Sequence, residues 1–445
     1  MPVERFETVI IGGGQAGLTM SHCLAKHGRP HVVLERHRIA ERWRSERWDS
    51  LRFQFPNWAM RLPEFAYTGN SPDDFAHRDE VVRFIEAYAS FIQAPVRTGV
   101  KVRALRLDPE TSRFRLDLGM NEIEAENVVI ATGPYQRPAI PAAASDLRDV
   151  LQLSASQYRN PAQLPPGGIL VAGAGASGCQ IAEELLRAGR SVYLSVGPHR
   201  RVPRTYRGKD IIWWIGALGL DEKIVDPDTA RQPPLLLSGA YGGRSIDLRA
   251  YAADGMTLLG RLMTARDGII TFAPDLSANL AAGDESYTAF TRAADAFTAN
   301  AFAPHAFAPH AFAPHAFAPQ SNMPATSNAN PPPHRPEPLT AIHPITTLDP
   351  RAAGITSVIW ATGYRYDFDW IHLDIFDRDN VPRHHRGIAR LPGVYFLGLQ
   401  YLHKTKSSFL SGVGEDAAYL AEHIALKTSA ANDGGEKVAP SHRKM

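Results

Sequence analysis

The sequence predicts an α/β protein made of two similar halves, each a mostly parallel sheet with helices packed against it. Two glycine-rich stretches, at 8–28 and 169–189, support this prediction, because each has the pattern of a buried strand, a tight turn and a helix. Two apolar strands, NVVIATG and SVIWATGY, run into the same small-residue turn and close the two halves alike. A chain of 445 residues has room for two or three domains.

Composition narrows the range of functions. The 48 basic and 46 acidic side chains leave a formal charge of +2, which gives no reason to expect a nucleic-acid partner. No apolar run approaches the roughly 18–20 residues that cross a membrane, and the N-terminus leads into a strand without a signal peptide. The two cysteines, Cys23 and Cys179, exclude a disulfide framework. Together these observations predict a cytoplasmic enzyme with neither a nucleic-acid nor a membrane partner.

The first glycine-rich stretch has the Rossmann-like pattern of a dinucleotide-binding turn. The strand Thr8–Ile11 leads into glycines spaced G-x-G-x-x-G, and a second strand, His31–Leu34, ends in Glu35. The first glycine permits the bend, the second lets the backbone approach a pyrophosphate, and the third lets helix and strand pack closely. A carboxylate about 20 residues further on accepts hydrogen bonds from ribose hydroxyls. The residues that we expect to contact a cofactor in this half are Gly12, Gly14, Gln15, Ala16, Gly17 and Glu35, with Thr132 and Gly133 in the closing turn.

The second stretch repeats the turn but not the acid. Its turn residues are Gly173, Gly175, Ser177 and Gly178. The position matching Glu35 is interpreted as Ser195, which does not repel a 2′-phosphate, and three arginines follow it: Arg200, Arg201 and Arg204. This half is therefore expected to bind NADPH, with use of NADH left open. The alternative is a solvated basic loop without a ligand.

Two dinucleotide sites in one chain indicate hydride transfer between two dinucleotides. The economical assignment is a tightly held FAD in the first half and a diffusible NADPH in the second. A disulfide reductase would pass the electrons to a cysteine pair, but Cys23 and Cys179 lie in different halves. Such enzymes also tend to carry an acid after the glycine of the last strand, where here Leu399 follows Gly398. Dioxygen is the electron acceptor that remains.

The predicted domains are not contiguous. The strand GVYFLG and the helix that begins near Gly412 are expected to return to the first half, where the helix N-terminus would stabilise negative charge on a reduced flavin. Residues 1–164 and 366–427 then form a discontinuous FAD-binding domain, residues 165–365 an NAD(P)H-binding domain, and residues 428–445 a flexible tail. The second domain carries an insertion at about 276–338 with the repeat AFAPH, interpreted as a low-complexity loop rather than a metal site made by His305, His310 and His315. No metal is expected.

These motifs resemble those of the class B flavin-dependent monooxygenases, which include the flavin-containing monooxygenases, the Baeyer–Villiger monooxygenases and the N-hydroxylases. The resemblance rests on the paired G-x-G-x-x-G motifs, on WATGY at 360–364, and on the segments 41–63 and 391–424. It covers nearly the whole chain except the insertion and the tail. It implies that Trp43, with its neighbour Arg42, lies near the flavin.

The resemblance also implies a reaction. NADPH reduces the flavin, dioxygen adds at the flavin C4a to give a (hydro)peroxide, and one oxygen atom passes to nitrogen, sulfur or a carbonyl carbon of a small organic substrate. Asn57 is the candidate hydrogen-bond donor to the bound oxygen, with a turn-forming role as the alternative. The Baeyer–Villiger fingerprint is missing, and Ser154 or Ser156 stands where the family has a histidine, so ketone oxygenation is not supported.

Two questions stay open from the sequence. The alternative function is a flavin reductase, an oxidase or an electron-transfer flavoprotein that does not oxygenate a substrate. The oligomeric state is either a monomer or a homodimer.

Overall fold

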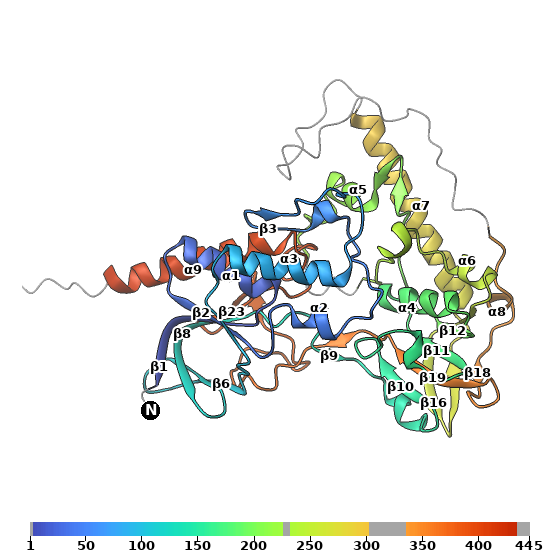
Figure 1. Ribbon diagram of the computed structural model, residues 1–445, viewed down its shortest axis with the longest axis horizontal. Coiled ribbons are helices and arrows are strands. Elements are labelled where there is room, and N and C mark those ends of the chain that lie inside the picture. Colours follow the sequence, from blue (N-terminus) through green and yellow to red (C-terminus); the bar gives the residue numbers. More distant parts are fainter. Residues whose placement is uncertain (1–2, 226–231, 302–334, 434–445) are drawn as a thin grey trace, which may run out of the picture.

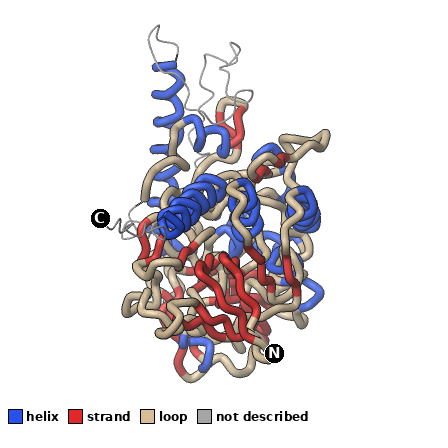
Figure 2. Tube along the Cα trace, turned by 90° about the vertical axis from the view of Figure 1, so that its left-hand side faces the viewer, coloured by secondary structure: helices blue, strands red, loops and turns tan. Residues whose placement is uncertain are grey.

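The computed structural model describes residues 3–225, 232–301 and 335–433. Its two large, mainly parallel sheets lie toward opposite ends of the long axis, with helices packed on them (Figure 1). Along the perpendicular view of Figure 2, the strands gather beneath a layer of helices. The predicted α/β fold with two similar halves is confirmed.

The first sheet has nine strands, with β1 (Glu4–Ile11) near its middle. β1 runs parallel to β2 (His31–Glu35) on one side and to β8 (Glu122–Ile130) on the other. Both faces of these strands are covered, which explains their runs of valine, isoleucine and leucine. The other strands of the sheet are β5 (Val96–Thr98), β6 (Ala104–Leu107), β7 (Phe114–Asp117), β21 (His384–His385), β22 (Ile388–Ala389) and β23 (Val394–Phe396).

The two ends of the chain meet on this sheet. Helix α1 (Gln15–Lys26) follows β1, and α9 (Val413–Asp433) packs against α1 from the far end of the sequence. β23 lies parallel to β8, so the C-terminal segment supplies both a strand and a helix to the first unit. α9 continues past residue 427, where the tail was expected to begin. A third helix, α3 (Arg78–Phe91), starts at a capping box formed by His77 and Glu80.

The second sheet has five strands in the order β10-β19-β11-β12-β15. The central strand β11 (Gly168–Ala172) is parallel to β12 (Val192–Ser195) and β19 (Ile355–Trp360). β15 (Thr257–Leu259) and β10 (Leu151–Ser154) form the edges. Because β10 pairs with β19, this sheet begins before the expected domain boundary at residue 164.

Helices of the second unit include part of the expected insertion. α4 (Ala176–Arg187) follows β11 as α1 follows β1. The segment expected to begin a low-complexity insertion instead forms the 26-residue helix α7 (Leu276–Ala301), which buries Leu276 and Leu280 in the core of this unit. The AFAPH repeats, with His305, His310 and His315, lie outside the described residues.

Shorter elements complete the two units and the segments between them. The helical ones are α2 (Glu41–Ser45), η1 (Asn57–Ala59), η2 (Ala142–Asp146), η3 (Pro161–Gln163), α5 (Ile211–Ala217), η4 (Ala240–Gly242), α6 (Leu248–Ala253) and α8 (Leu339–Ile342). The strands are β3 (Arg61–Leu62), β4 (Phe65–Ala66), β9 (Arg137–Pro138), β13 (Thr205–Tyr206), β14 (Lys209–Asp210), β16 (Leu262–Arg266), β17 (Ile269–Phe272), β18 (Thr347–Leu348) and β20 (Tyr364–Arg365). β9 pairs with β20 and so joins the segments that leave the two closing turns.

Candidate active site

A cavity of about 1510 Å³ lies between the two units, and both glycine-rich turns line it. The turns follow β1 and β11 at their carboxyl ends, which is where open α/β sheets place their ligand sites. The closing turns at Thr132 and Thr362 line the same cavity. Two nucleotide sites predicted from separate stretches of sequence therefore share one space.

The two turns have nearly the same backbone geometry. The N–H of Gly12 donates to Leu34 O at 2.8 Å, and the N–H of Gly173 donates to Ser195 O at 3.2 Å. Both glycines have positive φ, and a Cβ would stand 2.5 Å from Ala131 O at Gly12 and 2.6 Å from Ala361 O at Gly173. Only glycine lets each turn pass this close to its closing strand.

The helices that follow these turns begin at the cavity. Gly14 and Gly175 are the N-cap residues of α1 and α4, and neither helix has a side-chain cap. A Cβ on Gly14 would meet no atom within 4 Å, and one on Gly175 would meet only a side-chain carbon of Pro234 at 3.9 Å. Uncapped N–H groups that face open space fit the pyrophosphate of a dinucleotide. Both sites therefore have the donor set that FAD and NAD(P)H require.

The third glycine of each motif serves helix packing and does not contact the cavity. Gly17 and Gly178 do not line the cavity. A Cβ on either would overlap a carbonyl oxygen of its own turn, that of Gly12 or of Gly173. They act by letting the helix pack against the turn, which is the packing role expected of this position.

Glu35 lies at the end of β2 and lines the cavity. Its Oε2 accepts a hydrogen bond from Gly13 N at 2.7 Å, and its Oε1 accepts one from His37 N at 2.9 Å. These two bonds fix the carboxylate beside the first turn, and each oxygen keeps a further lone pair for a ribose hydroxyl.

The structure corrects the residue matched to Glu35 in the second half. Ile11 pairs with Leu34 across β1 and β2, and Ala172 pairs with Ser195 across β11 and β12. Ser195 is therefore the counterpart of Leu34, and the counterpart of Glu35 is the next residue, Val196. Val196 is fully buried. The second site still lacks an acid at this position, but not because serine replaces it.

Ser195 is also committed to other bonds. Its hydroxyl donates to Gly260 O at 3.0 Å and accepts from Leu262 N at 2.9 Å. It ties the end of β12 to the segment between β15 and β16, so its role is to hold the wall of the second site.

The three expected phosphate-binding arginines point in different directions. Arg200 lines the cavity, where its Nε donates to Pro233 O at 2.9 Å. Arg201 is only 7% exposed, does not line the cavity, and forms ion pairs with Asp247 at 2.9 Å and Asp284 at 2.7 Å. Arg204 is buried as well and pairs with Asp210. Arg201 and Arg204 thus do not join Arg200 in the expected phosphate site, because both lie off the cavity wall and are already neutralised by partly buried carboxylates.

Arg261 is a cavity-lining cation that the sequence reasoning missed. It follows β15, the strand next to β12, and its Cγ lies over Gly197 at the end of β12. Its side chain is 58% exposed, and its Nε lies 3.7 Å from Oδ2 of Asp275. No local sequence pattern indicates this residue, because only the order of the strands in the sheet brings residue 261 beside residue 197.

Other residues expected near the flavin line the first site. Gln15 donates from Nε2 to Ser408 O at 2.7 Å, and Trp43 stands edge-on to Phe53 with ring centres 6.1 Å apart. Arg42 pairs with Glu46 at 2.6 Å, and burial lowers the pKa of its guanidinium. The expected residues that line the cavity in this half are Gly12, Gly14, Gln15, Ala16, Glu35, Arg42, Trp43, Thr132 and Gly133, and in the second half Gly173, Gly175, Ser177, Ser195 and Arg200.

Asn57 and Gly412 lie outside the cavity wall. Asn57 is buried in η1, and its Nδ2 donates to Ser71 O at 2.9 Å, so the amide holds a turn. Gln54, in the segment just before Asn57, lines the cavity instead. A Cβ on Gly412 would overlap Lys406 O, which explains the glycine by packing, while Ser411 reaches the wall.

The cavity extends beyond the glycine-rich turns into an apolar chamber. Phe55 and Phe409 meet edge to face with ring centres 5.1 Å apart. The other apolar wall residues here are Ile212, Ile215, Leu235 and Leu237. Asp221 and Thr405 add polar atoms to the same wall. Apolar walls with a few polar atoms suit a small organic molecule.

The cysteines are remote from this chemistry. Both are buried, and burial raises the pKa of Cys23 to about 11 and that of Cys179 to about 12. Neither lines the cavity. Within the described part of the chain, no three His, Cys, Asp or Glu side chains are grouped to hold a metal ion.

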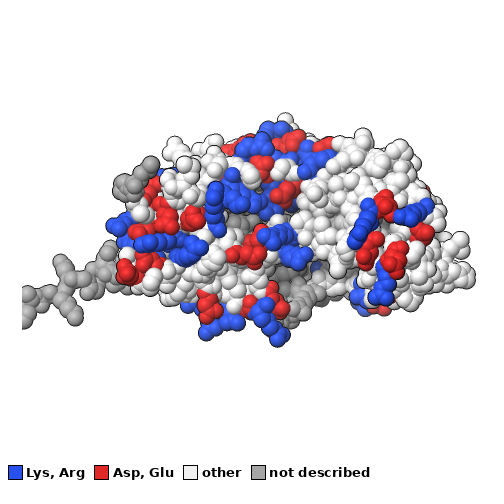
Figure 3. Space-filling view, turned by 90° about the horizontal axis from the view of Figure 1, so that it is seen from below, with Lys and Arg blue, Asp and Glu red and all other residues white. Residues whose placement is uncertain are grey.

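The surface and the helices add two observations. On the face shown in Figure 3, basic and acidic side chains lie side by side, in keeping with the formal charge of +2. None of the described helices combines the length and the apolar character needed to cross a bilayer.

Comparison with known proteins identifies relatives of this chain. Residues 9–213 match the family model described as pyridine nucleotide-disulphide oxidoreductase. The chain is 30% identical over 422 residues to an uncharacterised CzcO-like oxidoreductase of Geobacillus kaustophilus, covering 94% of this chain and 98% of that protein. It is 31% identical over 198 residues to the indole-3-pyruvate monooxygenase YUCCA1 of Oryza sativa, covering 42% of this chain and 48% of that protein. A flavin-containing monooxygenase from Stenotrophomonas maltophilia has the same fold, with a TM-score of 0.62 and 17% identity over 96% of this chain and 100% of that chain.

Proposed function

Because the chain belongs to the family of CzcO-like oxidoreductases, we propose that it is an NADPH-consuming monooxygenase that oxygenates a small organic molecule. It is an FAD-dependent oxidoreductase that also uses a nicotinamide nucleotide. The observation that carries the proposal is the single cavity, which both glycine-rich turns and an apolar chamber line together. Both cysteines are buried away from it, so the electrons have no thiol pair to reduce there.

The two halves take different cofactors in this proposal. The first turn, with the N-terminus of α1 and Glu35, holds FAD, and the second turn, with the N-terminus of α4, holds NADPH. The FAD domain then consists of the first sheet with β23 and α9, and the NADPH domain of the second sheet. When bound, the flavin supplies the redox chemistry that joins NADPH oxidation to reduction of dioxygen.

The residues of the chain bind, orient and exclude water. Arg200 and Arg261 stand where the second sheet ends, and we assign them to the 2′-phosphate of NADPH. Phe55, Phe409 and Ile212 keep the substrate end of the cavity dry, which limits hydrolysis and loss of reduced oxygen to the solvent. Gln54 lines the cavity, and we assign its side-chain amide to donate to bound oxygen.

The proposed reaction balances without a further reactant. Substrate, dioxygen, NADPH and one proton give the oxygenated substrate, water and NADP⁺. The oxygen-accepting atom is nitrogen, sulfur or a carbonyl carbon.

The test supplies the purified FAD-loaded protein with NADPH, isotopically labelled dioxygen and a panel of one thioether, one tertiary amine and one ketone. We expect one labelled oxygen atom in a product for each NADPH consumed in the presence of a good substrate. If all the NADPH consumed is recovered as hydrogen peroxide with every member of the panel, the protein is an oxidase or reductase and the proposal fails.

A further inference from the structure

Arg204 spans the boundary between the two units. It follows β12 in the second unit, is 3% exposed, and lies off the cavity wall. Its Nη1 donates to the backbone carbonyl of Gln54, in the first unit, at 2.6 Å. The same nitrogen donates to Ser238 O, in the second unit, at 3.2 Å. This buried guanidinium therefore ties the backbone of one unit to that of the other.

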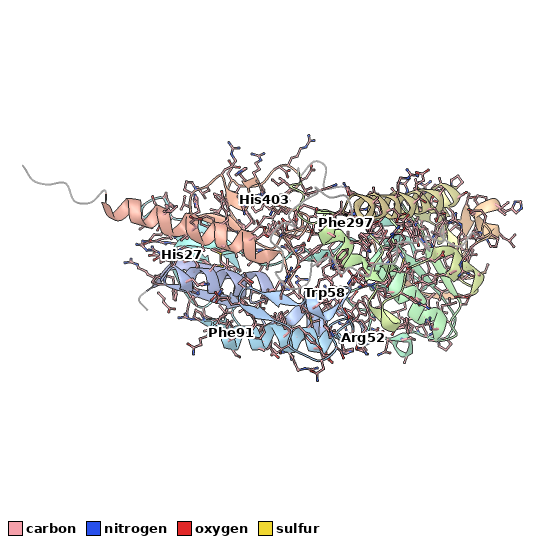
Figure 4. The ribbon with its side chains drawn as sticks, turned by 90° about the horizontal axis from the view of Figure 1, so that it is seen from above. His27, Arg52, Trp58, Phe91, Phe297 and His403 are labelled. Carbon is pink, nitrogen blue, oxygen red and sulfur yellow. The ribbon has the colours of Figure 1, made fainter. Side chains whose placement is uncertain are left out.

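Gln54 lies in a segment that forms part of the cavity wall. Phe53, Gln54 and Phe55 all line the cavity. Figure 4 labels Arg52 and Trp58, which stand on either side of this segment near the middle of the long axis. Because the guanidinium holds the carbonyl group of Gln54, it also limits how far the amide side chain of the same residue can move in the cavity.

Arg204 is itself anchored to another wall of the chamber. Its Nε donates to Oδ2 of Asp210 at 2.8 Å. Asp210 is the N-cap of α5, where its Oδ1 accepts from the N–H of Ile212 at 2.8 Å. Ile212 and Ile215, both in α5, line the apolar chamber. The guanidinium therefore fixes the position of Gln54 relative to α5.

The packing around Arg204 leaves little room for it to move. Its Cζ lies 4.3 Å from the ring centre of Phe75, in a cation–π contact. Two glycines bring a loop of the second unit against the same region. A Cβ on Gly239 would overlap Phe53 O, and a Cβ on Gly243 would overlap the ring of Phe75. Glycine at both positions lets the two units pack closely around the guanidinium.

The shape of the guanidinium suits this task. Its N–H groups lie in one plane and point in fixed directions, and Arg204 directs them at Asp210, Gln54 and Ser238. A lysine ammonium is a single nitrogen on a flexible stem, so it does not reproduce these directions. Arg204→Lys therefore keeps the charge that balances Asp210 but loosens Gln54.

We propose that Arg204 is a positioning residue for the oxygenation step and acts through Gln54. This inference rests on the proposed monooxygenase function, in which the amide of Gln54 donates to bound oxygen. While the amide is held in place, one oxygen atom reaches the substrate. When the amide is loosened, NADPH, dioxygen and one proton give only NADP⁺ and hydrogen peroxide. Arg204 thus determines how much of the NADPH consumed yields product, without contact with NADPH itself.

The first experiment compares Arg204→Lys, Gln54→Ala and the double variant, each loaded with FAD. The substrate is the thioether, amine or ketone that gives the most product with the unaltered protein. We expect Arg204→Lys to lower kcat for the product by about tenfold and to raise the peroxide formed per NADPH, because a small displacement of a positioned group is costly. KM for NADPH and the rate of anaerobic flavin reduction should stay unchanged. The double variant should form no more peroxide than Gln54→Ala alone.

The matched control is Arg201→Lys. Arg201 is also a buried arginine, but its ion pairs with Asp247 and Asp284 stay within the second unit. This variant should leave the peroxide yield unchanged. An unchanged yield in Arg204→Lys overturns the proposal. So does an equal rise in Arg201→Lys, or a further rise when Arg204→Lys is added to Gln54→Ala.

A second measurement needs no turnover. Hydrogen exchange of the FAD-loaded proteins, read by mass spectrometry, should be faster in residues 53–57 of Arg204→Lys than in the unaltered protein and unchanged in α4. Arg201→Lys should exchange at the normal rate in residues 53–57. If the unaltered protein gives no oxygenated product, the monooxygenase function fails, and faster exchange in Arg204→Lys still shows that Arg204 holds Gln54. Unchanged exchange overturns that hold.

Asp210→Asn provides a test that leaves Arg204 in place, should Arg204→Lys fail to fold. Flavin content and thermal unfolding show whether each variant is folded. Asparagine still caps α5 but replaces the charged bond to Arg204 by a neutral one, so the peroxide formed per NADPH should rise by a smaller factor. A folded Asp210→Asn protein with the peroxide yield of the unaltered protein overturns the proposal.

Discussion

Two glycines of the same motif serve different purposes, and alanine separates them. Gly17→Ala should destabilise the first unit, because the new methyl group would overlap the carbonyl oxygen of Gly12. Gly14→Ala should leave the fold intact, because its methyl group would meet no protein atom within 4 Å, but it should weaken FAD binding at the N-terminus of α1. Thermal unfolding and the flavin absorbance of the purified proteins test the pair. Equal stability of the two variants would contradict this division.

Adjacent arginines are also expected to differ. Arg200→Ala and Arg261→Ala should each raise KM for NADPH, by about tenfold if one charged hydrogen bond is lost, and leave KM for NADH nearly unchanged. Arg201→Ala should leave both KM values unchanged and lower the free energy of unfolding by about 3 kcal/mol, because Asp247 and Asp284 lose their partner. Steady-state kinetics with both nucleotides, together with urea unfolding, distinguish the two roles. An Arg201→Ala protein with normal stability and a raised KM for NADPH would restore the original grouping.

The sequence predicted the residues of the site where the signal is local. The turns at Gly12 and Gly173 and the acid at Glu35 are set by spacing along one strand, one bend and one helix. It misplaced Ser195 by one residue, because only the strand register shows that Ala172 faces Ser195. It could not find Asp221 or Arg261, since both reach the cavity through contacts between segments far apart in the chain.

At the scale of the elements, a contact joins the two units near the chamber. It lies between residues 221–225 and the loop before α9. A ring of ion pairs, which Lys404 and Lys406 form with Glu222 and Glu415, lies at this contact and holds Lys406 at 1% exposure. A buried charge of this kind is costly to leave alone. The ring therefore sets how firmly the chamber wall is held.

Glu415→Gln is expected to lower the free energy of unfolding by about 3 kcal/mol, because the buried Lys406 loses one of the two carboxylates that it contacts among the described residues. Adding Lys406→Met should recover part of that loss, since the buried charge is removed together with its partner. A double-mutant cycle by urea unfolding measures the coupling between the two residues. Strictly additive effects would show that the ring carries no coupling energy.

The elements themselves were predictable to different degrees. The predicted strands β1, β2, β8, β11, β12, β19 and β23 and helices α1 and α4 follow apolar patterns next to glycine turns, and they lie where expected. α9 begins where expected but runs past residue 427. α7 was missed because its stretch was assigned with the repeats that follow it to one low-complexity insertion. β10 was assigned to the first unit, whereas it pairs with β19 of the second. A strand of four residues is too short for its sequence pattern to indicate which sheet it joins.

At the scale of the whole molecule, duplication explains the architecture. Each unit places a strand, a glycine turn and a helix at one cavity, and β9 with β20 bridges the two closing turns. The cavity lies between units whose turns match in backbone geometry but differ in the side chains around them. That difference separates a held cofactor from a visiting one in the proposed reaction.

The return of the chain to its first sheet has a consequence for synthesis on the ribosome. The strands of the second sheet lie between residues 151 and 360, whereas the first sheet lacks β23 and the cover of α9 until residues 394–433 emerge. The N-terminal unit must therefore wait, with the 128–130 edge of β8 unpaired, while the unit after it is completed. In a growing chain, the part made first is the part finished last.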